Sequence, residues 1–159
     1  MIKKIDNFNL DNANKIWHIF QNSYAVEANI LKVDDFPPLK RGVNQIIKSN
    51  NNFFAFYDYS DLVALIEIDI KAKIHIQSLV VCPDHFRKGY AKKLVKYVLS
   101  MFDSHVFTVE TGFDNLPAKN LYSSLGFAEM LQFEAAYGIK KIKYEKKITN
   151  NSLGKTLQV

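Results

Sequence analysis

Cysteine is almost absent from this chain of 159 residues, which contains only Cys82. A single cysteine excludes an intramolecular disulfide and any cysteine-rich metal site. No hydrophobic run approaches the roughly 20 residues that a membrane-spanning helix needs, and residues 1–6 are too poor in apolar side chains for a signal peptide. These absences favour a soluble protein of the reducing cytoplasm that needs no membrane and no metal.

The positive charge is not gathered into a nucleic-acid-binding motif. The formal net charge is +5, which permits anionic ligands, but the lysines are spread along predicted helices and the last strand. They are not interleaved with aromatic residues as in RNA-reading motifs. The lysines of residues 140–147 follow a segment that we interpret as an edge strand, where lysine commonly blocks aggregation. We therefore expect no nucleic-acid partner.

The order of the predicted elements indicates a single α+β domain. Apolar residues at helical spacing predict helices at residues 10–30, 39–47, 91–102 and 116–125. Runs rich in β-branched and aromatic residues predict strands at residues 1–6, 53–57, 62–70, 74–81, 106–110, 127–137 and 139–148. A chain of this length can bury a full core without disulfides or metals. We expect residues 1–148 to form the domain and residues 149–159 to be a polar tail.

The turn after the strand of residues 74–81 has the composition of an anion site. The helix that follows, residues 91–102, begins without a Ser, Thr or Asn cap, and Arg87 and Lys88 stand where the helix dipole is already positive. Gly89 allows a ligand to approach the backbone closely. Free backbone N–H groups beside two cations indicate a phosphate-binding turn. A solvated basic helix start explains the same residues equally well.

A second informative stretch spans residues 115–127. Asn115 suits a helix N-cap, Pro117 stands in the first turn where its missing N–H is tolerated, and Gly126 suits the position after the helix end. Asn115 and Tyr122 are seven residues apart and so share one helix face. Taken alone, Tyr122 is more readily explained as a core aromatic than as a functional residue.

Together these stretches resemble motifs A and B of the GNAT superfamily of acetyl-CoA-dependent N-acetyltransferases. In motif A a strand ends in apolar-x-apolar-x-Pro, here residues 79–83, and Arg/Gln-x-x-Gly-x-Gly/Ala follows, here residues 86–91. Phe86 departs from the motif, because the family has Arg or Gln at its position. Motif B, Asn-x-x-Ala-x-x-Leu-Tyr-x-x-x-Gly-Phe, is matched at Asn115, Ala118, Leu121, Tyr122, Gly126 and Phe127. The resemblance covers about residues 1–148.

The resemblance implies a three-layer α/β/α fold with a mixed, mainly antiparallel sheet of six to seven strands flanked by about four helices. It implies acetyl-CoA as co-substrate, with a backbone N–H near Val81 polarising the thioester carbonyl. The residues expected to bind the cofactor are Leu79, Val80, Val81, Phe86, Arg87, Lys88, Gly89, Tyr90, Ala91, Lys92 and Asn115. Phe86 offers no polar side-chain contact to a pyrophosphate, so the loop backbone and Arg87 would supply that contact.

By the same resemblance, the acetyl group passes to a primary amine by direct attack. Tyr122 matches the family's general acid for the departing thiolate, and Glu110 matches a position used as base by some members. A water chain would serve equally well as base. Three rivals have simpler explanations: Glu67 as a solvated strand carboxylate, His75 as a structural histidine and Cys82 as a packing residue.

The acceptor is expected to enter between the first two helices and the C-terminal hairpin. Glu27, Asp34 and Asp35 lie in that region and suit the ammonium of a small-molecule or peptide amine, although Asp34 and Asp35 equally suit the turn N–H groups. A monomer and a homodimer both fit the sequence. The alternative function, motivated by Phe86, is a non-catalytic CoA-binding sensor or interaction module on the same fold.

Overall fold

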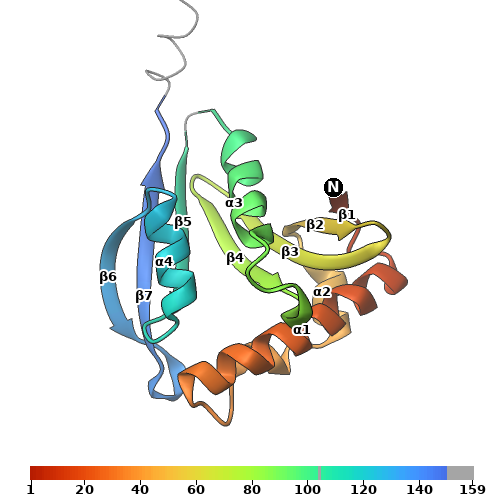
Figure 1. The fold of residues 1–159 in the computed structure, drawn as a ribbon, viewed down its shortest axis with the longest axis horizontal. Coiled ribbons are helices and arrows are strands. Elements are labelled where there is room, and N and C mark those ends of the chain that lie inside the picture. Colours follow the sequence, from red (N-terminus) through yellow and green to blue (C-terminus); the bar gives the residue numbers. More distant parts are fainter. Residues whose placement is uncertain (104, 150–159) are drawn as a thin grey trace, which may run out of the picture.

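A seven-stranded sheet forms the middle layer of the computed structural model, which describes residues 1–103 and 105–149 (Figure 1). The order across the sheet is β1-β2-β3-β4-β5-β7-β6, and every pair is antiparallel except β4 with β5. The strands are β1 (Ile2–Ile5), β2 (Asn52–Asp58), β3 (Asp61–Ile70), β4 (Ile74–Val81), β5 (Val106–Gly112), β6 (Ala128–Glu134) and β7 (Lys140–Lys147). The predicted mixed, mainly antiparallel sheet is confirmed. Residues 150–159, most of the expected tail, lie outside the described residues.

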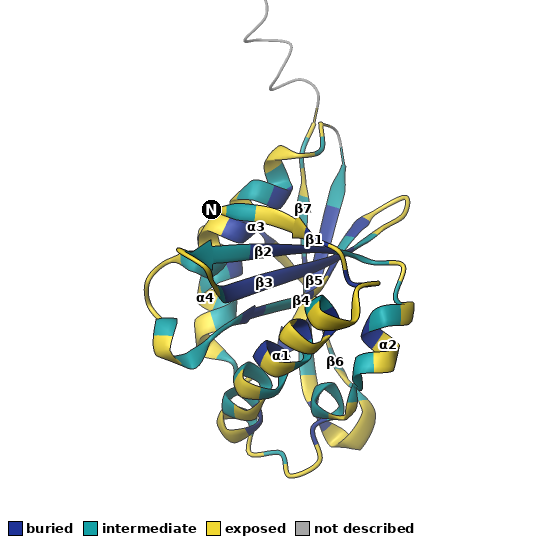
Figure 2. Ribbon diagram, turned by 90° about the vertical axis from the view of Figure 1, so that its right-hand side faces the viewer, coloured by how far each residue is buried: buried dark blue, intermediate teal, exposed yellow. Residues whose placement is uncertain are grey.

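Helices cover both faces of this sheet. The described residues contain α1 (Leu10–Leu31), α2 (Val43–Lys48), α3 (Tyr90–Ser100) and α4 (Leu116–Ser124), with short 3₁₀ turns η1 (Pro37–Lys40), η2 (Pro83–His85) and η3 (Ala136–Gly138). Helices α3 and α4 lie on one face, and α1 and α2 lie on the other (Figures 1 and 2). The three-layer arrangement is confirmed. None of these helices is long and apolar enough to cross a membrane.

Strand alternation builds a hydrophobic core on each face. Successive side chains of a strand point to opposite faces, so Phe53 packs in the cluster of Ile16 on α1, while Phe54 packs in the cluster of Leu94 on α3. Each such fully buried apolar side chain stabilises the fold by about 1.5–3 kcal/mol relative to exposure. Both helix layers are therefore held by the sheet itself, and the sheet positions them relative to each other.

The parallel strands β4 and β5 separate soon after they begin to pair. Their register ends at Ile76 opposite Val109, after only three residue pairs. On its other side β4 shifts register against β3, which leaves Gln77 as an extra, unpaired residue. A bulge of this kind bends its strand and increases the local twist. The sheet therefore opens between the second half of β4 and the end of β5.

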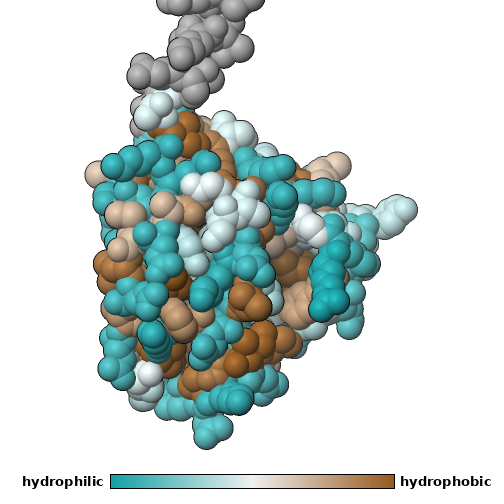
Figure 3. Space-filling view, turned by 60° about the vertical axis from the view of Figure 1, so that its left-hand side comes forward, coloured by the Kyte–Doolittle hydropathy of each residue, from teal (hydrophilic) through white to brown (hydrophobic). Residues whose placement is uncertain are grey.

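The interpretation of residues 140–147 as an edge strand is wrong. β7 lies inside the sheet, because it pairs with β5 on one side and β6 on the other. Its exposed or half-exposed lysines alternate with the buried Ile142 and Tyr144. The edge strand on this side of the sheet is β6, where Met130 and Leu131 stay about half exposed. Figure 3, which brings this side forward, shows hydrophobic side chains scattered among hydrophilic ones.

Candidate active site

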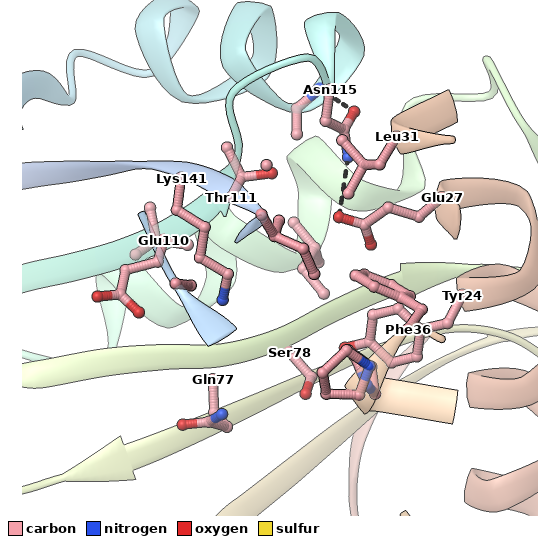
Figure 4. Close-up of a pocket in the computed structure, with 18 of the residues that line it drawn as sticks. Tyr24, Glu27, Leu31, Phe36, Gln77, Ser78, Glu110, Thr111, Asn115 and Lys141 are labelled. Carbon is pink, nitrogen blue, oxygen red and sulfur yellow. Dashed lines mark hydrogen bonds between the residues drawn. The ribbon is translucent and has the colours of Figure 1, made fainter. Parts of the chain in front are cut away.

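A pocket of about 450 Å³ occupies the opening between β4 and β5. Its walls come from β4 and β5, α1, the segment around η1, the first half of α4 and the connection between β6 and β7 (Figure 4). Of the walls between which the acceptor was expected, α1 and the C-terminal hairpin line this pocket, whereas α2 does not. Five residues predicted for the site line this pocket: Glu27, Leu79, Glu110, Asn115 and Tyr122.

The start of α3 leaves backbone donors without partners among the residues that the structure describes. Gly89 precedes the helix with φ 78°, and the first intrahelical bond runs from the Lys93 N–H to the Gly89 carbonyl at 3.1 Å. No side chain among the described residues caps the N–H groups before it. A Cβ built on Gly89 would meet no atom within 4 Å. The turn therefore requires glycine for its backbone, faces open space, and fits a phosphate group at the helix N-terminus.

The remaining residues predicted to bind the cofactor lie between the pocket and the start of α3. Residues 79–81 form the end of β4, with Val80 buried in the core beside α1. Residues 86–89 form the exposed loop between η2 and α3, and residues 90–92 form the first turn of α3. Phe86 itself is 42% exposed. The path leads from the pocket to the uncapped helix start.

Asn115 joins two helices across the mouth of the pocket. Its side-chain oxygen accepts a hydrogen bond from the Ala118 N–H at 3.2 Å, which caps α4 as predicted. Its side-chain nitrogen donates to Oε1 of Glu27 on α1, also at 3.2 Å (Figure 4). Burial raises the pKa of Glu27, and the hydrogen bond from Asn115 partly opposes that rise. The Glu27 carboxyl is therefore held in a partly desolvated position at the pocket.

This raised pKa gives the stability of the protein a pH dependence. The folded state binds the Glu27 proton more tightly than the unfolded state, so the free energy of unfolding falls as pH rises above the usual pKa of 4.5. Glu27→Gln keeps an oxygen acceptor for Asn115 and removes the buried charge. We expect the free energy of unfolding of the variant to decrease less with rising pH. At neutral pH the variant should therefore be more stable than wild type. Urea unfolding between pH 4 and 8 measures how the free energy of unfolding of each protein changes with pH. The control is Glu134→Gln, which removes an exposed carboxylate. Parallel slopes for Glu27→Gln and wild type would contradict the assignment.

Tyr122 belongs to the core and to the pocket at once. Only 4% of it is exposed, and its ring packs edge-on against Phe127 with centroids 5.6 Å apart and against Tyr144 at 5.9 Å. Burial raises the pKa of the Tyr122 hydroxyl well above its usual value, and the nearby charge of Glu27 adds to the rise. The hydroxyl is therefore protonated at neutral pH and can donate a hydrogen bond.

Glu110 lines the same pocket from its exposed side. It lies on β5, directly opposite Lys143 of β7 in the strand register. Its carboxylate lies across the pocket from Glu27 and Asn115 (Figure 4). The side chain of Glu110 is exposed to solvent, so water can reach its carboxylate beside the pocket.

A buried ionic network holds the bulge of β4. Glu67 on β3 is fully buried, so its interpretation as a solvated carboxylate is wrong. Arg41 binds both of its oxygens at 2.7 and 2.8 Å, while the Ser78 hydroxyl donates at 2.8 Å and the Asn51 amide at 3.0 Å. A buried carboxylate needs such partners to offset its desolvation. Because Ser78 follows the unpaired Gln77, the network fixes where β4 turns away from β5.

Neither of the other two rival residues lines the pocket. The Nδ1 atom of His75 lies 2.7 Å from the Thr108 hydroxyl, and burial lowers the pKa of His75, so the ring is neutral at pH 7. Cys82 follows β4, where its N–H donates to the Val63 carbonyl at 2.8 Å. In residues 1–103 and 105–149, no group of three or more His, Cys, Asp or Glu side chains is arranged to hold a metal ion.

Asp34 and Asp35 are not brought to this pocket. They line a second pocket between the end of α1 and the connection from β6 to β7. Asp35 also forms an exposed ion pair with Lys40 at 2.7 Å. Of the three carboxylates considered for the acceptor, the structure places Glu27 alone beside Tyr122.

Three residues at the site were not anticipated from the sequence: Arg41, Ser78 and Lys141. Glu67 did carry a signal, because it is a charged residue between the apolar Ile66 and Ile68 and a buried polar group needs partners. Ser78 carried little, since Gln77 and His75 make the same strand polar elsewhere. Lys141 carried none, since it is one of several lysines in β7. Its ammonium points into the pocket in the structure (Figure 4).

Residues 13–127 match the family described as Acetyltransferase (GNAT) family. The chain is 31% identical over 119 residues to the UPF0157 protein YqkA of Bacillus subtilis (strain 168), a match that covers 74% of this chain. It spans only 35% of that relative's length.

Solved structures share the fold at low sequence identity. The ribosomal-protein-S18-alanine N-acetyltransferase of Escherichia coli superposes with a TM-score of 0.73 over 94% of each chain at 17% identity. YncA of Salmonella typhimurium, solved with its cofactor acetyl-CoA, superposes with a TM-score of 0.70 over 93% of each chain at 14% identity. These likenesses show that this chain shares the overall fold of these proteins.

Proposed function

Because this chain belongs to the GNAT acetyltransferase family, we propose that it transfers the acetyl group of acetyl-CoA to a primary amine by direct attack. The observation that supports this most is the opening between β4 and β5, which places Tyr122, Glu110 and the backbone of β4 around one pocket. The thioester of acetyl-CoA supplies the activated acetyl group. The chain supplies position, electrostatics and proton transfer.

The start of α3 would hold the pyrophosphate of the cofactor. Residues 87–92 combine uncapped N–H groups, the glycine conformation at Gly89 and the cations Arg87, Lys88 and Lys92. Most of such a cradle consists of backbone donors, so the family position taken by Phe86 is not essential to it. Asn115 would contribute at the pocket end, although its amide already contacts Glu27 and Ala118.

The exposed side of β4 would hold the pantetheine arm and the thioester carbonyl. The Cys82 N–H donates toward β3, to the Val63 carbonyl. Because backbone groups alternate sides along a strand, the N–H groups of Leu79 and Val81 point toward the opening. A donor there stabilises the negative charge that develops on the carbonyl oxygen during attack.

Tyr122 would assist the departure of the CoA sulfur. Its hydroxyl is protonated at neutral pH because burial raises its pKa. A thiol has a pKa near 8.5, so full proton transfer from this tyrosine is uphill. Its contribution is therefore a hydrogen bond that strengthens as charge develops on the sulfur, with solvent completing the protonation.

Glu110 would take the proton that the acceptor ammonium must lose before attack. An alkylamine has a pKa near 10, so a base beside the pocket is needed at neutral pH. Its exposure also allows a water held by Glu110 to act in its place. Glu110→Gln separates these roles: an unchanged kcat/KM on the acid side of the pH profile would assign the proton to water alone.

A thiol-release assay with acetyl-CoA tests the proposed activity. The acceptor panel comprises polyamines, amino acids, aminoglycosides and peptides with free N-termini. We expect CoA release that depends on both the amine and the protein, and an acetylated amine by mass spectrometry. Tight acetyl-CoA binding without turnover of any amine would instead favour the CoA-binding sensor or interaction module.

A further inference from the structure

One cation at the pocket forms no ion pair with a described residue, although its charge opposes the rise in the pKa of the Glu27 carboxyl. Lys141 lines the pocket from β7, and its ammonium points inward (Figure 4). No ion pair or hydrogen bond within the described part of the chain engages this ammonium. The other cation of the pocket, Arg41, already gives both terminal nitrogens to Glu67. Lys141 is therefore the cation that can bind an anion from outside.

The surroundings of Lys141 favour a small, singly charged anion. Apolar side chains, among them Leu31, Phe36 and Ile139, line the same pocket and strengthen any charge interaction inside it. Two carboxylates, Glu27 and Glu110, also line it and would repel a group of higher negative charge, such as a phosphate. A carboxylate matches one ammonium in this setting.

The same strands place an opposite charge beside Lys141. Lys141 lies opposite Gly112 in the register of β5 and β7, and Glu110 lies opposite Lys143. Glu110 and Lys141 are therefore diagonal neighbours on one sheet face, with roughly 7–8 Å between such positions. One small molecule that carries both an amine and a carboxylate can contact both side chains.

We propose that Lys141 binds a carboxylate of the acceptor, so that the acceptor is an amino acid or a peptide with a carboxylate near its amine. This inference rests on the proposed acetyl transfer, since the same pocket must receive the amine. Lys141 is a specificity-determining residue in this account: it positions the acceptor and takes no part in proton transfer.

Calorimetric titration tests the proposal without relying on turnover. Amino acids with small, apolar, polar and charged side chains are each titrated, together with their amides, into protein saturated with CoA. We expect at least one amino acid to bind roughly 10- to 100-fold more tightly than its amide, which is the range for one charge-assisted hydrogen bond. A dipeptide amide with aspartate after the N-terminal residue tests whether the carboxylate comes from a peptide side chain.

Three variants test whether Lys141 causes the preference for an amino acid over its amide. Lys141→Met should abolish it, Lys141→Arg should retain it, and Lys147→Met, which removes the same charge from the far end of β7, should leave it unchanged. Circular dichroism confirms that each variant is folded. The proposal is overturned if no member of the panel is preferred over its amide, or if the preference survives Lys141→Met.

Thiol release measured on the same proteins keeps the two proposals apart. A carboxylate preference that requires Lys141, without release of CoA from acetyl-CoA, would contradict acetyl transfer and leave the anion site standing. If the rate of amine turnover depends neither on a carboxylate in the acceptor nor on Lys141, the anion site is contradicted and acetyl transfer is supported.

Discussion

Tyr122→Phe is expected to lower kcat by roughly 100-fold while leaving the Kd for CoA nearly unchanged, as is typical when one hydrogen-bond donor that stabilises developing charge is removed. The substitution preserves the ring, which packs against Phe127 and Tyr144. It removes only the hydroxyl that would stabilise the departing sulfur. Steady-state kinetics with the best acceptor of the panel measure kcat, and calorimetry with CoA measures Kd.

The control for Tyr122→Phe is Tyr144→Phe. Tyr144 contacts Tyr122 from β7 and is also buried, but it does not line the pocket. Its loss of a hydroxyl should leave kcat within about threefold of wild type, less than the loss of one donor that stabilises developing charge would cost. A Tyr122→Phe enzyme with full kcat would show that Tyr122 serves the core alone, which is the simpler explanation that the sequence left open.

Arg41→Met is expected to destabilise the fold by about 3–5 kcal/mol, the loss typical when one partner of a buried ion pair is removed. The Glu67 carboxylate has no exposed surface, and without Arg41 only Ser78 and Asn51 would bind it. Arg41 also lies over the rings of Phe20 and Phe53, at 5.6 and 5.9 Å from their centroids. Urea unfolding at pH 7 measures the change.

The neighbouring residue provides a matched control for this prediction. Lys40 also forms an ion pair, with Asp35, but both side chains are more than half exposed. Lys40→Met should therefore change stability by less than about 1 kcal/mol. The double variant Arg41→Met/Glu67→Met should recover much of the loss, because no buried charge remains. A loss below about 1 kcal/mol for Arg41→Met would show that the network does not hold β4.

Local sequence patterns predicted most of the fold. The strand of residues 74–81 and the helix after it follow from β-branched runs and helical spacing, and both are confirmed. Gly126 adopts φ 85° directly after the end of α4, the conformation expected of a glycine at that position. These features depend on neighbouring residues alone, so the sequence displays them.

Features set by distant residues were not predictable in this way. The lysines of β7 resemble an edge strand locally, yet β6 returns to pair beside them. Glu67 resembles a solvated carboxylate, yet Arg41, 26 positions earlier, covers it. Lys141 differs from Lys143 only by its place in the register with β5. Strand order and register decide all three, and neither is encoded by local spacing.

The same distinction between local patterns and distant contacts applies to the residues of the site. Tyr122, Glu110 and Asn115 were found through a motif or a motif's neighbourhood, and all three line one pocket. Glu27, Asp34 and Asp35 were grouped by their position in the chain, but only Glu27 reaches the pocket. Helix α1 ends at Leu31, so the two aspartates lie beyond the helix that directs Glu27 inward.

The thermal midpoint with and without acetyl-CoA, measured for wild type, Gly89→Ala and Gly126→Ala, tests the central claim most directly. Both glycines have positive φ, 78° and 85°, so alanine strains the backbone at each, and at Gly126 the flexible end of the Lys146 side chain must also move. Only Gly89 faces the uncapped start of α3. A ligand that binds the folded state alone at 100 times its Kd stabilises it by about 2.7 kcal/mol. The account predicts that acetyl-CoA raises the midpoint of wild type and Gly126→Ala by several degrees but that of Gly89→Ala much less. No shift for wild type, or an equal shift for Gly89→Ala, would contradict it.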